Sequence, residues 1–215
     1  MRGTMVRNII WDVDGTLLDT YPAIVRAFLQ VLHAREKTVA AERIYDLARI
    51  GLSHCATVLA AASGLPVEQV AEGFHETYGA MSLDDQGPFA GAADVCRAIL
   101  ARGGANVIVT HRGRASTCAL LARHGMEDLF SGIVSADDGY AKKPDPAGFR
   151  AVMVLRGLEA EATIAVGDRD IDVRAAQAAG LRTVLYGATS SEAGPDLAIA
   201  AYSELIPALT ARGLW

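Results

Sequence analysis

The chain has 215 residues, 51% of them hydrophobic, with a formal net charge of −5 at pH 7; this length is enough for a sizeable core with or without a small companion domain. The acidic balance and the lack of a Lys/Arg run argue against nucleic acid or an anionic membrane as a partner. No apolar run reaches transmembrane length, and the N-terminal one is too short for a signal peptide. Three widely spaced cysteines suggest buried free thiols in a reducing compartment. We therefore expect a cytoplasmic protein.

A short apolar run at residues 8–11 (N-I-I-W) is typical of a buried strand in a parallel sheet. It leads into residues 12–16 (D-V-D-G-T), in which Gly15 marks a sharp turn. We therefore expect Asp12 and Asp14 at the carboxyl end of a strand, where open α/β sheets bind ligands. Two carboxylates about 4 Å apart repel by roughly 4 kcal/mol at an effective dielectric of 20. The pair needs a shared proton or a cation, and a hard divalent cation if further acidic residues converge there.

The segment of residues 20–87 shows helical periodicity and no strand signal. Thr20 is a plausible N-cap for its first helix. Thr38 is predicted to cap a second helix, and Ser53 a third. A breaker cluster at residues 87–91 (G-P-F-A-G) is predicted to be a linker. We therefore predict an inserted, all-helical domain.

From residue 92 onward, predicted helices and strands alternate, with strands expected at residues 106–110, 132–135, 163–166 and 183–186. Such a β-α-β series predicts a parallel sheet with helices on both faces. The expected fold class is α/β, with a Rossmann-like core domain made of residues 1–19 and 88–215. We expect the helical domain of residues 20–87 to lie over the carboxyl edge of the sheet, as a cap on its ligand crevice.

Three further stretches with chemically suggestive residues fall where predicted strands end. Thr110 and His111 follow the second strand, where a hydroxyl and the next amides can donate to a phosphate oxygen. Lys143 lies in a stiff loop at residues 142–146 (K-K-P-D-P), and a lysine held there can neutralise a phosphoryl group and an aspartate together. Residues 167–172 (G-D-R-D-I-D) place three carboxylates at a helix start, which is more than a cap needs. The topology brings all these stretches to one edge of the sheet.

Four stretches of the chain resemble, in the same order, the motifs of the haloacid dehalogenase superfamily: D-x-D-G-T, a Thr after the second strand, K-P-x-P and G-D-x-x-x-D. The chain is most similar to its phosphatase-like members, which carry a helical cap inserted after the first motif. The similarity covers nearly the whole length. The chain departs from the pattern at His111 and Arg112, where many relatives have an asparagine, and at Arg169, where a serine is common.

This resemblance implies a role for each acidic residue. Asp12 would attack phosphorus and form an aspartyl-phosphate. Asp14 would protonate the leaving oxygen and then deprotonate the water that hydrolyses the intermediate. Mg²⁺ would be held by Asp12, the main-chain carbonyl of Asp14 and Asp168. Asp172 would be a further or outer ligand, with Asp170 as the alternative that completes the metal shell.

The resemblance also implies the groups that bind the phosphate. Thr110 and Lys143 would hold the phosphoryl oxygens, with Thr16 and His111 as further substrate contacts. A dianionic phosphate cannot enter a cluster of carboxylates without charge compensation from Mg²⁺ and Lys143. Asp14 favours phosphoryl transfer over halide displacement, because the dehalogenases of the superfamily lack this second acid and need no metal.

Substrate choice is expected to lie in the cap. Arg49, Ser53 and His54 are hypothetical substrate contacts, although a capped helix turn with a surface Arg and His explains them more simply. The predicted protein is a phosphatase for a small phosphorylated metabolite, of the phosphoglycolate or sugar phosphate class. The alternatives are a phosphomutase of the β-phosphoglucomutase type and a non-catalytic regulatory protein on the same fold. A monomer is the default expectation, and a dimer is the alternative.

Overall fold

The computed structural model describes residues 4–187 and 191–215. Contacts divide the chain into two compact units, one made of Met1–Leu18 with Pro88–Trp215 and the other of Asp19–Gly87. Residues 1–3 and 188–190, which fall within the predicted core domain, lie outside the described residues. The larger unit is α/β and the smaller one is helical, so the predicted fold class is confirmed.

The larger unit is built on a parallel sheet, in which the described residues form six strands in the order β3-β2-β1-β4-β5-β6. The strands are β1 (Asn8–Trp11), β2 (Ala105–Val109), β3 (Gly132–Val134), β4 (Thr163–Gly167), β5 (Arg182–Tyr186) and β6 (Leu197–Ile199). The strand order runs outward from β1 in one direction and then returns beside β1 with β4. Ligand crevices of open α/β sheets lie at such a switch point, outside the carboxyl ends of the strands.

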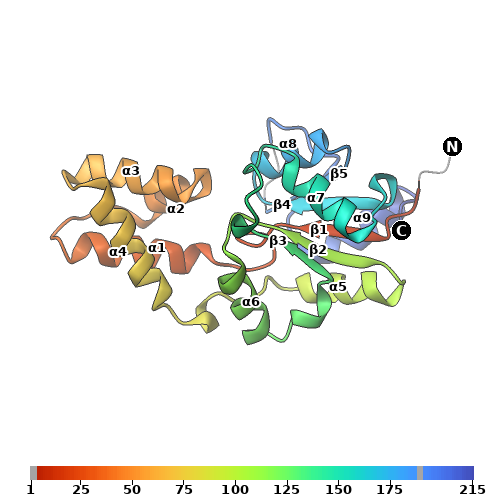
Figure 1. Cartoon of the computed structure of the whole chain (residues 1–215), viewed down its shortest axis with the longest axis horizontal. Coiled ribbons are helices and arrows are strands. Elements are labelled where there is room, and N and C mark those ends of the chain that lie inside the picture. The colour runs from red at the N-terminus through yellow and green to blue at the C-terminus, as the bar shows by residue number, and fades with distance from the viewer. Residues whose placement is uncertain (1–3, 188–190) are drawn as a thin grey trace. The chain divides into compact units, whose positions relative to one another are not determined.

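Helices cover both faces of this sheet. They are α5 (Ala92–Ala101), α6 (Arg114–Arg123), α7 (Ala147–Arg156), α8 (Asp170–Ala178) and α9 (Leu205–Ala211). Figure 1 shows α7 and α8 on one side of the sheet and α5 and α6 on the other. Phe149 and Val152 of α7 pack with Val107 and Val109 of β2 in one buried cluster. Among the described residues, every helix is too short or too polar to traverse a lipid bilayer.

Trp11 links the sheet to the loop that follows β1. Its buried indole donates a hydrogen bond to Asn106 Oδ1 (3.0 Å) and packs edge-on against Tyr202, with ring centroids 5.6 Å apart. Asn106 donates in turn to the carbonyl of Cys96 on α5 (2.9 Å), so these buried polar groups are satisfied. The hydroxyl of Tyr202 donates to the carbonyl of Thr16 (2.9 Å) and thereby helps to hold the D-V-D-G-T loop in place.

The smaller unit contains α1 (Tyr21–His33), α2 (Ala41–Ile50), α3 (Leu52–Ser63) and α4 (Val67–Gly79), followed by a short 3₁₀ turn (Leu83–Asp85). It has a hydrophobic core of its own. Phe28 of α1 stacks on Phe74 of α4 with ring centroids 4.2 Å apart, and Ile44 and Leu59 are fully buried beside them. Each helix buries one apolar stripe, as its periodicity predicts.

The two predicted caps inside this unit were wrong. Helix α2 begins at Ala41 with Ala40 as its N-cap, so Thr38 lies outside it. Ser53 is the second residue of α3, whose N-cap is Gly51. The extended backbone of Gly51 lets α3 start directly after α2, which leaves no room for a cap at Ser53.

Two further expectations failed in the larger unit. The strand β6 was not predicted, because its three residues (L-A-I) are too few to show an alternating pattern and Ala198 faces solvent. Cys118 is exposed, whereas Cys55 and Cys96 are buried as expected. Its helix α6 buries only Thr117, Leu120 and Leu121, so Cys118 falls on the outer face.

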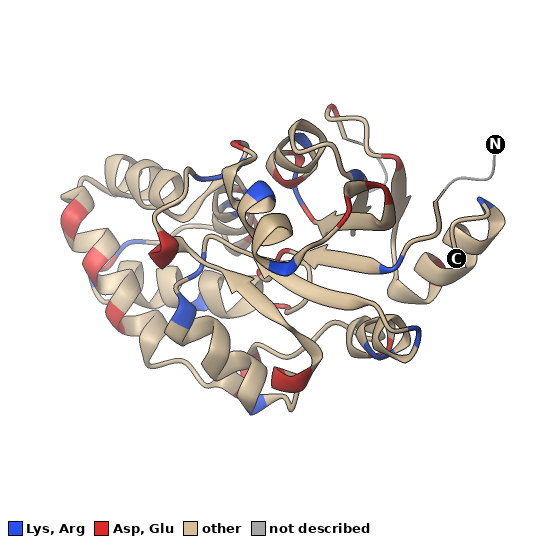
Figure 2. Ribbon diagram, turned by 45° about the vertical axis from the view of Figure 1, so that its right-hand side comes forward, with Lys and Arg blue, Asp and Glu red and all other residues tan. Residues whose placement is uncertain are grey.

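Charged residues of both signs are interspersed along the described ribbon (Figure 2).

Candidate active site

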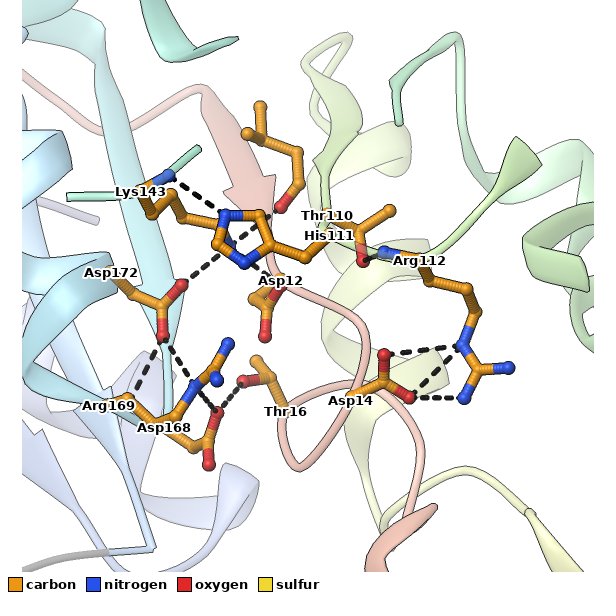
Figure 3. A network of polar contacts seen from close by, with 11 residues as sticks. Asp12, Asp14, Thr16, Thr110, His111, Arg112, Lys143, Asp168, Arg169 and Asp172 are labelled. Carbon is orange, nitrogen blue, oxygen red and sulfur yellow. Dashed lines mark hydrogen bonds and ion pairs between the residues drawn. The ribbon is translucent and has the colours of Figure 1, made fainter. Parts of the chain in front are cut away.

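The carboxyl ends of three adjacent strands bring the predicted residues together (Figure 3). Asp12 directly follows β1, Thr110 follows β2 and Asp168 follows β4. Lys143 enters from the loop between β3 and α7, and Asp172 lies in the first turn of α8. Because β1 pairs in parallel with both β2 and β4, their ends meet at one edge.

Lys143 lies at the centre of this group. Its Nζ donates to Asp12 Oδ1 (2.7 Å), to Asp172 Oδ1 (2.5 Å) and to the carbonyl of Val109 (3.0 Å). An ammonium has three donors, so these contacts use all of them. Such complete pairing is what makes a buried lysine tolerable.

Three carboxylates converge beside this ammonium. Asp12, Asp168 and Asp172 each offer an oxygen, and these oxygens lie within 4.8 Å of one another. The hydroxyl of Thr16 donates to Asp168 Oδ1 (3.4 Å), whereas Asp170 accepts a hydrogen bond from Ser191 and is not one of the converging acids. Hard divalent cations prefer carboxylate oxygens.

One atom of this cluster is unsatisfied. Asp12 Oδ2 is buried and has no hydrogen-bond partner among the described residues. A buried carboxylate oxygen left in this way is costly unless a cation or a ligand completes it. The converging carboxylates fit a divalent cation, and the orphaned oxygen of Asp12 is left for that cation or for a ligand beside it.

Burial and charge shift the acids in different directions. Burial raises the pKa of Asp12 to about 6, with Lys143 opposing the shift and Asp172 adding to it. For Asp172, burial alone would raise the pKa, but Lys143 and Arg169 outweigh it and hold the pKa below its ordinary value. Burial would also lower the pKa of Lys143, yet Asp12 and Asp172 raise it overall. Lys143 therefore stays protonated, and a further positive charge would favour the ionised form of Asp12.

The residues that follow β2, Thr110 to Arg112, lie beside this acidic cluster. Thr110 is buried, and its hydroxyl accepts a hydrogen bond from the N–H of Arg112 (3.1 Å). His111 Nε2 accepts a hydrogen bond from the main-chain N–H of Lys143 (2.8 Å), which connects the residues after β2 to the lysine loop. Burial, with help from the charge of Lys143, lowers the pKa of His111 to about 4. The imidazole is therefore a neutral acceptor at pH 7.

Two arginines complete the site, and sequence reasoning gave neither a role. Arg112 forms a forked ion pair with Asp14 on the side of Asp12 away from Asp172 (Figure 3). The main-chain N–H of Arg169 donates to Asp172 Oδ2 (3.2 Å). The side-chain Nε of Arg169 lies 3.8 Å from Asp168 Oδ1 and 3.7 Å from Asp172 Oδ2. Their only signal in the sequence was that both depart from the family pattern.

The three hypothetical substrate contacts belong to the helical unit. Arg49 is partly buried near the end of α2, and Ser53 and His54 are exposed in the first turn of α3. Their contact with substrate stays a prediction.

Comparison with known proteins agrees with this geometry. Residues 9–186 match the family model described as haloacid dehalogenase-like hydrolase. The chain belongs to this family. It is also 32% identical over 218 residues to a phosphoglycolate phosphatase of Pectobacterium atrosepticum, covering 95% of this chain and 92% of the relative. A phosphoglycolate phosphatase of Yersinia pestis is 29% identical over 225 residues, with 95% and 93% covered.

Solved structures of the family share the fold. A predicted phosphoglycolate phosphatase from Haemophilus somnus superposes with a TM-score of 0.82 at 19% identity, covering 95% of this chain and 98% of that one. A Thermotoga maritima protein provisionally classed as a beta-phosphoglucomutase has a TM-score of 0.80 at 19% identity, with 96% and 99% covered. The chain is thus a phosphatase of the haloacid dehalogenase-like family, and its acidic cluster is that of a metal-using enzyme.

Proposed function

We propose that the protein is a Mg²⁺-dependent phosphatase that hydrolyses a small phosphate monoester, of the phosphoglycolate class, through an aspartyl-phosphate on Asp12. The observation that carries the proposal is the state of the Asp12 carboxylate. One of its oxygens is bound by Lys143 at 2.7 Å, and the other is buried without a hydrogen-bond partner among the described residues, beside Asp168 and Asp172. That second oxygen is the one suited to attack phosphorus.

The first half of the reaction transfers the phosphoryl group to the protein. Asp12 Oδ2 forms a bond to phosphorus, the bond from phosphorus to the ester oxygen breaks, and Asp14 gives a proton to that oxygen. Lys143 exchanges one of its three present contacts for an equatorial phosphoryl oxygen. Thr110 holds another of these oxygens, on which negative charge is concentrated. Thr16 and His111 line the same loops and are further candidates for substrate contact.

The second half regenerates Asp12. Asp14 takes a proton from a water molecule, whose oxygen bonds to phosphorus as the bond to Asp12 breaks, and inorganic phosphate leaves. Mg²⁺ would be held by Asp12, the main-chain carbonyl of Asp14 and Asp168, with Asp172 outside them, and would neutralise charge on the phosphoryl group. Its octahedral demand and small size suit a compact all-oxygen set.

The relatives support the substrate class. Phosphoglycolate phosphatases that match over nearly the full length are 27–32% identical to this chain. We infer that the helical unit of residues 20–87 acts as the cap and contributes to substrate choice. A phosphomutase remains the second candidate, because the same acids would return the phosphoryl group to a sugar instead of water.

The first test is hydrolysis of para-nitrophenyl phosphate and of phosphoglycolate, with Mg²⁺ and with EDTA. Mg²⁺-dependent release of phosphate is expected from the wild type and from Asp94→Asn, a control at an exposed acid on α5. Asp12→Asn should lose at least about 10³-fold in kcat, because an amide is a poor nucleophile. Activity that survives in Asp12→Asn would reject the proposal. Adding a sugar bisphosphate primer with a sugar monophosphate distinguishes the mutase, which would isomerise the sugar without releasing phosphate.

A further inference from the structure

We propose that Arg112 is a specificity-determining residue that binds a carboxylate on the leaving part of the substrate, and that this carboxylate releases Asp14 for proton transfer. The inference rests on the proposed function, in which Asp14 is the acid and base. It goes further by assigning the substrate's second anionic group to a named residue of the larger unit.

The starting observation is the forked ion pair between these two residues. Arg112 Nη2 lies 2.5 Å from Asp14 Oδ1, and Arg112 Nε lies 3.1 Å from Oδ1 and 3.2 Å from Oδ2. The Arg112 side chain is only 8% exposed and that of Asp14 is 24% exposed. Arg112 Nη1 also donates to Ser116 Oγ (2.7 Å), which anchors the guanidinium to the first turn of α6.

This pair conflicts with the proposed role of Asp14. Both carboxylate oxygens accept hydrogen bonds from Arg112, and an ionised carboxylate in such a pair has no proton to give to an ester oxygen. Asp14 must leave the guanidinium before it can move a proton. If nothing replaced its carboxylate, a charge-assisted pair with a largely buried guanidinium would be lost, which is a costly change.

A substrate that carries its own carboxylate resolves the conflict. Its carboxylate takes the place of Asp14 on the fork of Arg112, so one charge-assisted pair is exchanged for another of the same kind. Ser116 keeps the guanidinium in place during the exchange. An ester with a neutral arm offers no such replacement, so it leaves Asp14 paired.

Position supports this assignment. Figure 3 shows the Arg112–Asp14 pair on one side of Asp12 and the acidic cluster with Lys143 on the other. In the proposed reaction Asp14 protonates the ester oxygen, which requires this oxygen to come within hydrogen-bond reach of Asp14. Arg112 contacts Asp14 directly, so a carboxylate a few bonds from that oxygen is within reach of the guanidinium.

The test compares two esters of similar size, phosphoglycolate and ethyl phosphate, by kcat and KM with Mg²⁺. We expect the wild type to prefer phosphoglycolate by about 100-fold in kcat/KM, because a site built for a polar group discriminates strongly against its absence. Arg112→Gln should reduce this preference to about threefold or less, through loss on phosphoglycolate together with a gain on ethyl phosphate, because Asp14 is then no longer held by a guanidinium. Arg112→Lys should fall between them, since it restores the charge but not the fork.

Arg114→Gln is the matched control, because Arg114 is two residues away, is paired with Asp138 and has a 45% exposed side chain. It should keep the wild-type preference. An equal loss on both esters in Arg112→Gln would indicate a structural role and overturn the proposal, as would an unchanged preference. Hydrolysis of both esters at equal rates by the wild type would overturn this proposal alone. Hydrolysis of neither ester nor of para-nitrophenyl phosphate would overturn the proposed function with it.

Discussion

Lys143 Nζ lies 2.7 Å from Asp12 Oδ1, and both side chains are only 2% exposed. The two residues are far apart in the sequence, so the loop of residues 142–146 has to be held firmly against β1. The hydrogen bond from the Lys143 N–H to His111 and the bond from its ammonium to the Val109 carbonyl supply that support. In the proposed mechanism, this pair positions the nucleophile and places a permanent positive charge next to it.

Replacing Lys143 with methionine should damage both activity and stability. It leaves Asp12 and Asp172 buried without their shared cation, and breaking such a pair costs about 3–5 kcal/mol. Urea unfolding in EDTA measures this loss, and kcat should fall by about 10³-fold or more. Added Mg²⁺ should recover part of the stability, because it compensates the same carboxylates. Lys142→Met, at the exposed neighbour, should match the wild type in both measurements.

Replacing Arg169 with serine should strengthen metal binding. Its Nε lies 3.8 Å from Asp168 Oδ1 and 3.7 Å from Asp172 Oδ2, so its charge competes with a cation for these oxygens. Removing it should tighten binding of Mg²⁺ by about tenfold, which corresponds to roughly 1.4 kcal/mol. Calorimetric titration without substrate measures the affinity. Arg174→Ser, at an exposed position on the same helix, should leave it unchanged, and weaker binding in Arg169→Ser would contradict this interpretation.

Gly167 is required at its position because α8 approaches β4 closely. A Cβ added there would lie 2.3 Å from the Cβ of Asp172, a distance that real side chains do not tolerate. Gly167→Ala should lower the free energy of unfolding by about 2–3 kcal/mol and should also displace Asp172. Gly79→Ala at the end of α4 is the control, since a Cβ there meets nothing within 4 Å and should stabilise by at most about 1 kcal/mol. A Gly167→Ala variant as stable as the wild type would show that the contact relaxes without cost.

His111 should make the fold sensitive to acid. Burial lowers its pKa in the folded protein to about 4, below the ordinary value of 6.5, so the unfolded chain binds the proton more tightly. The associated stability is complete above pH 6.5 and is lost as the pH falls toward 4. Because the imidazole is partly exposed, we expect a loss of about 1–2 kcal/mol.

The comparison with His111→Asn isolates this effect, because Asp12 titrates in both proteins. Urea unfolding in EDTA between pH 7 and pH 4 should show the wild type losing stability relative to the variant. Parallel pH profiles would mean that His111 does not carry the proton linkage.

Much of the acidic site could be predicted because topology determines it. Asp12, Thr110 and Asp168 each follow a strand, and a parallel sheet brings strand ends to one edge whatever their separation in the sequence. The helix stop at Gly64 was also predictable, since its left-handed backbone (φ 67°) suits glycine.

Side-chain pairing was not predictable in the same way. Arg112 reaches back to Asp14 through a long flexible side chain, and a charge at that position could equally have pointed to solvent. The strand β6 was missed because the neighbouring β5 supplies its stability, and three residues carry no pattern of their own. The caps at Thr38 and Ser53 failed because α2 begins only at Ala41, and because the extended backbone of Gly51 lets α3 begin already at Leu52.

The central claim is that Asp12 carries the phosphoryl group during turnover. The most direct measurement is acid quenching of the wild type within milliseconds of mixing with phosphoglycolate and Mg²⁺, followed by peptic digestion at low pH and mass spectrometry. We predict a phosphorylated peptide that contains Asp12, with the modification on that residue, and its absence from Asp12→Asn and from samples mixed in EDTA. Full-rate turnover by the wild type with no phosphate on Asp12 at any quench time would contradict the account. The same holds if no phosphate on Asp12 is found in an Asp14→Asn variant, which slows hydrolysis of the intermediate.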